Sequence, residues 1–188
     1  MIRKTLLIAL PFVLAACGER EAAPAPSEDT TRPTTNPLVE RVAGARIVVD
    51  ANGLGAKGSE PLRFGSTRDD VDAVAAQAFG QPGGQSRNEE CGAGPMDFSE
   101  YGPLQIAFLD GRFAGWFLRE GEGVVTSDGI RAGIPLDTLK RERQVQAQNT
   151  TLEGEFSYTT ADYGTITGFV DESGTITGLQ AGLSCFFR

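Results

Sequence analysis

The sequence predicts an α+β fold that is built mainly on antiparallel sheet. Two observations support this class: a helix signal at residues 66–80 precedes hairpin signals, and the same order returns later in the chain. Helices followed by runs of strands are typical of α+β proteins, whereas strict alternation indicates a parallel sheet. We expect one compact domain over residues 38–188, with a first repeat at about 46–122 and a second at about 123–188.

The first helix has clear start and stop signals. Ser66 or Thr67 can cap it, and an aspartate three residues further on completes a capping-box pattern. Gly80 and Pro82 end it. Five apolar residues share one helical face: Val71, Val74, Ala75, Ala78 and Phe79.

The second helix signal is shorter. Pro135 can occupy its first turn, and Leu136 with Leu139 form a two-residue apolar stripe. The residues that follow are charged, so we expect this helix to end near Arg143.

Two hairpins and a closing strand follow from turn chemistry and β-branched alternation. Asp110-Gly111 is a strong hairpin turn between apolar strands. Residues 164–168 and 174–178 both read Gly-Thr-Ile-Thr-Gly and flank a polar turn, which predicts a second hairpin. Residues 183–187 are expected to form the closing strand.

Four short segments recur in the same order, which indicates an internal duplication. The spacing between matching segments shrinks along the chain, as expected if the first copy has longer loops. Residues 48–54 match 124–130, 62–65 match 130–133, 69–71 match 137–139, and 105–117 match 165–180.

The first 16 residues have the layout of a secretory signal peptide, with Arg3 and Lys4 before a short apolar run. Leu14-Ala15-Ala16-Cys17 closes this run and resembles the lipobox of bacterial lipoproteins. The resemblance implies cleavage before Cys17, diacylglycerol on its sulfur and acylation of the new N-terminus. Gly18 rather than Asp follows the cysteine, which in that family favours the outer membrane over the inner one. An ordinary signal peptide that ends in Cys is the alternative.

Composition describes the segment that follows and limits the partners of the whole chain. Residues 17–37 carry the cysteine and a Pro-, Ala- and Thr-rich stretch that predicts a disordered linker. The net charge is −8, and loss of residues 1–16 makes the chain more acidic still. The acidic charge predicts no binding of nucleic acid. Attachment to the membrane through the lipid on Cys17 is what the lipobox resemblance implies.

The cysteine count predicts one disulfide. If Cys17 carries lipid, Cys91 and Cys185 remain, and an extracytoplasmic compartment favours their pairing. Two free, buried thiols are the alternative.

The helix start and its flanks resemble those of the SmpA/OmlA family of small outer-membrane lipoproteins and the related β-lactamase-inhibitor-like fold. Ser66 stands where that family usually has Met, and the second copy lacks the Gly-x-Pro stop. The resemblance implies a helix followed by antiparallel strands and, for such folds, mostly protein-binding roles. The residues that carry it are Gly65, Thr67, Asp70, Val71, Phe79, Gly80 and Pro82.

Patterns for catalysis, cofactors and metals are weak. Histidine is absent, and no Ser lies in a Gly-x-Ser-x-Gly elbow. Residues 53–58 read G-x-G-x-x-G, but Ser59-Glu60-Pro61 follows instead of a helix, so we expect a flexible loop. The acidic pairs lack the spacing of a calcium loop. We expect no enzyme activity, no cofactor and no metal.

Aromatic residues gather around the first predicted hairpin. Trp116, Phe113 and Tyr101 are candidates for a binding face, although alternating aromatics in a hairpin also fill cores. The loop at residues 91–95 is a second candidate surface.

These observations predict a non-enzymatic, lipid-anchored lipoprotein of the cell envelope, held at the outer membrane and facing the periplasm. We expect it to act as an interaction or assembly module for another envelope protein. The alternative is a periplasmic lipoprotein that binds a small ligand or peptidoglycan in a pocket between the repeats.

Overall fold

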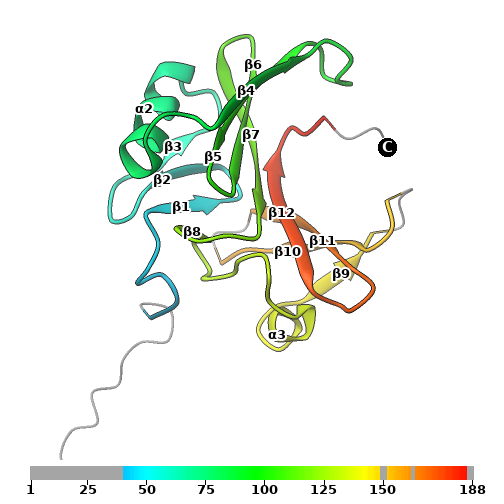
Figure 1. Ribbon diagram of the computed structural model, residues 1–188. Helices are drawn as coiled ribbons and strands as arrows, with labels where there is room; N and C mark the ends of the chain where they lie inside the picture. Colours follow the sequence, from blue (N-terminus) through cyan, green and yellow to red (C-terminus); the bar gives the residue numbers. More distant parts are fainter. Residues whose placement is uncertain (1–39, 149–151, 162–163, 186–188) are drawn as a thin grey trace, which may run out of the picture. The chain divides into compact units, whose positions relative to one another are not determined.

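Two sheets and two helices form the part of the chain that the structure describes (Figure 1). The computed structural model describes residues 40–148, 152–161 and 164–185, all of which belong to one unit, residues 35–188. The predicted signal peptide, Cys17 and the predicted linker lie outside the described residues. No helix within these ranges is both long and apolar enough to span a bilayer. The mostly antiparallel α+β class is confirmed.

The larger sheet has eight strands, and every pair of neighbours is antiparallel. Its order is β4 (Gly84–Asn88), β5 (Met96–Tyr101), β6 (Leu104–Leu109), β7 (Arg112–Arg119), β12 (Ile176–Gly182), β11 (Thr165–Val170), β10 (Glu155–Thr159) and β9 (Val145–Ala147).

The smaller sheet has four strands, in the order β3 (Leu62–Arg63), β2 (Gly53–Ala56), β1 (Ile47–Asp50) and β8 (Val124–Thr126). Strands β1 and β8 are parallel, and the other neighbours are antiparallel. The prediction of a flexible loop over residues 53–58 was wrong, because β2 occupies most of it and buries Leu54. A Cβ on Gly53 would overlap the carbonyl oxygen of Leu62, so the glycine permits the close approach of β3.

The longer helix is α2 (Arg68–Phe79), as predicted. The Thr67 hydroxyl caps it by accepting the N–H of Asp70 at 3.3 Å. Gly80, at φ 84°, ends it and donates its N–H to the carbonyl of Ala76 at 2.8 Å. The predicted stripe faces inward: Val71 and Ala75 are buried, and Val74, Ala78 and Phe79 pack against the core.

The second helix is α3 (Leu136–Lys140), short as predicted but ending before Arg143. Pro135 occupies the N-cap position and supplies no side-chain cap. Its anchor is Leu139, which is fully buried in the main core.

Both predicted hairpins form. Asp110 and Gly111 join β6 to β7 with φ values of 51° and 71°. Asp171 organises the turn between β11 and β12, where its carboxylate accepts hydrogen bonds from the hydroxyl and N–H of Ser173 and from the N–H of Thr175. These bonds, the Ser173 hydroxyl first, lower the pKa of Asp171.

The predicted closing strand is wrong for residues 183–185, and 186–188 lie outside the described residues. Strand β12 ends at Gly182, whose φ of 77° turns the chain out of extended geometry. The N–H of Leu183 still donates to the carbonyl of Ala114 at 2.8 Å, so the segment leaves the sheet beside β7.

Candidate interaction surface

The aromatic residues that were candidates for a binding face are core residues. Tyr101, Phe113 and Trp116 are 2%, 1% and 2% exposed. The indole N–H of Trp116 donates to the carbonyl of Asp50 at 2.8 Å, which ties the larger sheet to β1. The prediction of a binding face at these three residues is therefore corrected in favour of the core alternative.

The larger sheet has two faces of different character. On one face, Ile106, Trp116 and Leu179 join a core cluster with Val71 of α2 and Leu139 of α3. The helices and the smaller sheet therefore cover this face. We call the opposite face the outer face.

A cross-strand row marks the outer face from β5 to β9. Its members are direct partners in the register, so their side chains leave the same side of the sheet. Amides, hydroxyls and one phenyl ring predominate, and one residue is charged. The row consists of Glu100, Gln105, Phe117, Gln180, Thr167, Ser157 and Gln146.

Aromatic and amide contacts organise the outer face locally. The rings of Phe117 and Phe169 lie 6.2 Å apart, and the Arg119 guanidinium lies 5.4 Å from the Phe117 ring centroid. Gln105 donates to the Glu100 carboxylate at 3.2 Å. Aromatic rings with few charges are typical of the centre of a protein–protein interface.

A groove of about 340 Å³ lies on this face at its β4 to β7 side. Phe98, Gln105, Ala107 and Phe117 contribute outer-face side chains to it. Residues 86–88 of β4 and residues 183–185 also line it, and Trp116 contributes to the lining. Within this segment Leu183 is 44% exposed, which makes it an exposed large apolar side chain beside the groove.

The Cys91–Cys185 disulfide forms, as predicted, and holds one side of the groove. It joins the loop after β4 to the segment after β12, with a Cα–Cα distance of 4.9 Å. The two cysteines pack in a small apolar cluster that includes Met96, Phe98 and Ala107. The position of residues 183–185 therefore depends on a covalent bond as well as on packing.

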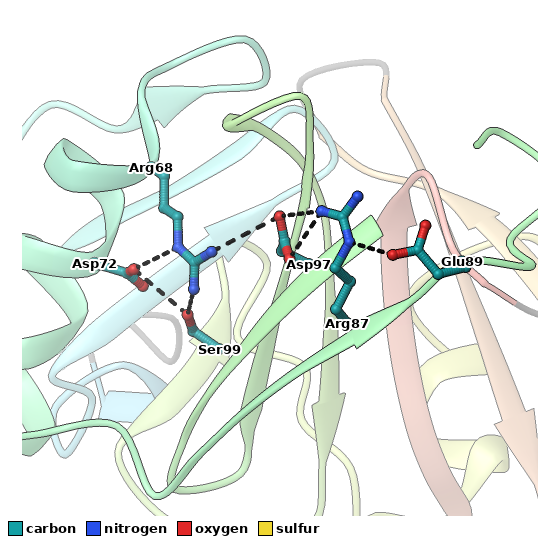
Figure 2. A network of polar contacts seen from close by, with 6 residues as sticks. All are labelled: Arg68, Asp72, Arg87, Glu89, Asp97 and Ser99. Atoms are coloured by element: carbon teal, nitrogen blue, oxygen red, sulfur yellow. Dashed lines mark hydrogen bonds and ion pairs between the residues drawn. The ribbon is translucent and has the colours of Figure 1, made fainter. Parts of the chain in front are cut away.

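A polar network fastens α2 to β4 and β5 (Figure 2). Arg68 bonds Asp72 at 3.1 Å and Ser99 at 3.1 Å and approaches Asp97 at 3.9 Å. Arg87 pairs with Asp97 at 3.2 Å and with Glu89 at 2.6 Å. Because these charges are mutually paired, the network stabilises the contact between helix and sheet.

Tyr101 extends this network into the core. Its hydroxyl donates to Asp72 at 3.1 Å. Burial, and then the negative charge of Asp72, raise the pKa of Tyr101 to about 12. Ser99, the hydroxyl beside Asp72, is fully buried, so it is out of reach of a substrate.

Metal ligands do not converge in the described ranges: no group of three or more His, Cys, Asp and Glu side chains is placed to hold an ion there. Arg68 and Asp72, four residues apart on α2, pair along the helix instead.

Sequence reasoning missed Gln105 and Thr167 as parts of a surface; Gln180, between them in the row, is only 5% exposed. The available signal was alternation: in the predicted hairpins these residues stand between apolar neighbours such as Leu104, Ile106 and Ile166. Alternation separates the polar residues of a strand from the apolar ones, but it does not indicate that the polar residues of neighbouring strands line up.

Comparison with known proteins adds no relative. No protein-family model matches the chain, and neither a curated protein nor a solved structure matches it significantly.

Proposed function

We propose that this chain is a non-enzymatic, lipid-anchored envelope lipoprotein that binds another envelope protein through its outer face. The observation that carries the proposal is this face, where a row of mostly neutral polar side chains and Phe117 adjoins a groove of about 340 Å³. Protein-binding surfaces combine such aromatic anchors with few charges at their centre. The resemblance of short sequence motifs to SmpA/OmlA-like modules is analogy and agrees with the same role.

The anchor rests on Leu14-Ala15-Ala16-Cys17, in which Cys17 would carry the lipid. The Cys91–Cys185 disulfide agrees with an oxidising compartment such as the periplasm. Two or more acyl chains give stable membrane attachment, whereas one chain gives only marginal binding. The outer membrane, facing the periplasm, is the proposed location.

The strand order supports an internal duplication. Strands β4 to β7 form one half of the larger sheet and β9 to β12 the other, and the two halves meet through their last strands, β7 and β12. Each half is preceded by one helix, α2 or α3. We propose that the two halves descend from one repeated unit, the second having lost part of its helix.

The lipid anchor predicts that Cys17→Ser moves the protein from the membrane fraction to the soluble fraction. The wild-type chain should remain with membranes until detergent is added and show the mass of an acylated cysteine, because its lipid partitions into the bilayer. The variant should lack the acyl mass and be released without detergent. Ala22→Ser in the predicted linker is a matched control that should behave like the wild type. An unmodified thiol at Cys17 in the native protein would contradict the anchor.

Site-specific photo-crosslinking in cells tests the outer face. A photoreactive residue at Gln105 or at Thr167 should give adducts of the same mass, because both positions lie on the proposed interface. The same residue at Gln77, exposed on α2, is the matched control and should give none of these adducts. Adducts from Gln77 alone, or equal adducts from all three positions, would contradict the proposed face.

A second candidate is the binding of a small polar ligand or peptidoglycan. A hollow of about 510 Å³ beside β9 and β10 favours it, since amides and hydroxyls suit a polyhydroxyl ligand. Titration of the protein with soluble peptidoglycan fragments should shift the amide signals of this hollow if the candidate is right. Its lining includes Gln144, Gln146, Gln148, Ser157, Thr159 and Thr165.

A further inference from the structure

We propose that the groove beside the disulfide takes an uncharged aromatic or aliphatic side chain from a partner segment whose neighbouring residues are Lys or Arg. This inference rests on the proposed protein-binding function and names the chemistry of the partner at that site.

Apolar and neutral polar groups share the lining. Phe117 and Leu183 supply the exposed apolar surface, and Leu183 is 44% exposed on the side held by the disulfide. Phe98 and Ala107 are buried beneath them, and the polar groups come from Ser86, Asn88, Gln105 and Ser184. A volume of about 340 Å³ accommodates a large side chain together with part of its backbone. An apolar side chain that enters the groove removes its own surface and the apolar surface of the lining from water, which is favourable.

No charged side chain of the lining points into the groove. Arg87 is the one charged residue of the lining, but it is the register partner of Asp97, so its side chain leaves the sheet on the face that α2 covers. There its Nε and Nη1 bond Glu89 at 2.6 Å and Asp97 at 3.2 Å. A carboxylate or a cation that enters the groove would therefore find no charged partner in the lining. Burial of an unpaired charge is costly, so the anchor itself is expected to be neutral.

The charge beside the groove favours cationic neighbours. Glu89 and Glu90 occupy the turn between Asn88, which lines the groove, and Cys91, whose disulfide partner Cys185 lines it as well. Both glutamates are exposed, and Glu90 forms no ion pair with any residue in the described ranges. The whole chain is acidic, with a net charge of −8, so its field attracts cations. Lys or Arg next to the anchor would complement this turn.

Synthetic peptides of about nine residues test both parts of the inference, with sizes of effect chosen from typical burial and screening energies. One has a central Phe between Lys residues, two others replace Lys by Ser or by Glu, and a fourth replaces Phe by Ala. Fluorescence anisotropy of dye-labelled peptides reports binding to the full mature chain. The Lys–Phe peptide should bind saturably, the Ala peptide about tenfold more weakly, and the Glu peptide about fivefold more weakly at low salt. In about 0.5 M salt, the affinities of the Lys–Phe and Glu peptides should agree within about twofold, because salt screens the charges.

Two charge variants locate the cationic preference. Glu90→Gln should reduce the difference between the Lys and Ser peptides to within about twofold, because the complementary charge is gone. Glu172→Gln, in the exposed turn between β11 and β12, removes the same charge outside the groove lining and should leave the difference intact.

Several results would overturn the inference. Equal affinity for the Lys and Glu peptides would contradict the preference for cationic neighbours. An Ala peptide that binds as tightly as the Phe peptide would contradict the apolar anchor. If the protein forms a dimer that Phe117→Arg dissociates, the occupant of the groove is a second copy of the chain. If deletion of residues 186–188 raises the affinity for the Lys–Phe peptide about tenfold, the occupant is the chain's own C-terminal end. Crosslinks from Gln105 without peptide binding reject this inference and retain the adaptor role. Peptide binding without those crosslinks rejects the adaptor role.

Discussion

At the scale of single residues, the contact between Tyr101 and Asp72 predicts a pH effect on stability. Burial raises the pKa of Tyr101 to about 12 in the folded chain, whereas an unfolded tyrosine titrates near 10. The folded state therefore favours the protonated phenol, and its contribution is complete below pH 10 and lost as the pH rises towards 12. We expect the free energy of unfolding to fall by on the order of 1–2 kcal/mol across this window.

The measurement is urea denaturation at several pH values between about 9 and 12, with Tyr101→Phe as the matched variant. The variant keeps the ring in the core and removes the titrating hydroxyl, so the difference between the two curves isolates Tyr101. An identical decline in both proteins would contradict the assignment. Contributions from groups that both chains share cancel in the difference.

At the scale of elements, the cap of α2 predicts a stability change. Thr67→Ala removes the acceptor of the Asp70 N–H, and loss of such a cap costs about 1 kcal/mol in the free energy of unfolding. Thr67→Ser keeps the hydroxyl and should stay within about 0.5 kcal/mol of the wild type. Denaturant melts of the three proteins check this, and an Ala variant as stable as the Ser variant would show that the cap contributes nothing.

At the scale of the whole molecule, the disulfide predicts the largest effect. It joins residues 94 apart in the sequence, and closure of a loop of that length stabilises the folded state by roughly 4–5 kcal/mol on the chain-entropy model. The double variant Cys91→Ala, Cys185→Ala should lose about this much free energy of unfolding. Reduced wild type is the control and should match the variant, while equal stability of oxidised and reduced protein would contradict the prediction.

Most elements could be predicted because their signals are local. The cap and stripe of α2, the Asp110-Gly111 turn and the second hairpin each depend on residues close together in the sequence. The disulfide followed from counting cysteines. The strand at residues 53–56 was missed because its glycines serve the approach of β3, which is a tertiary requirement.

The candidate surface could not be predicted from alternation. Phe113 and Trp116 are an odd number of residues apart, so a strict strand period would place them on opposite faces. A register shift between Ala107 and Phe108 in the β6–β7 pairing lets both side chains reach the core. Phe117 then faces outward although its neighbours in the sequence are buried.

By itself, the sequence determined where the helices and hairpin turns lie and which cysteines pair, because each depends on neighbouring residues or on simple counting. Only the tertiary structure decided which face of the larger sheet is covered and where the groove lies. That choice depends on contacts between distant parts of the chain, such as the Trp116 indole on the Asp50 carbonyl and Cys185 on Cys91. Periodicity distinguishes the two faces of a strand, but only packing selects the buried one.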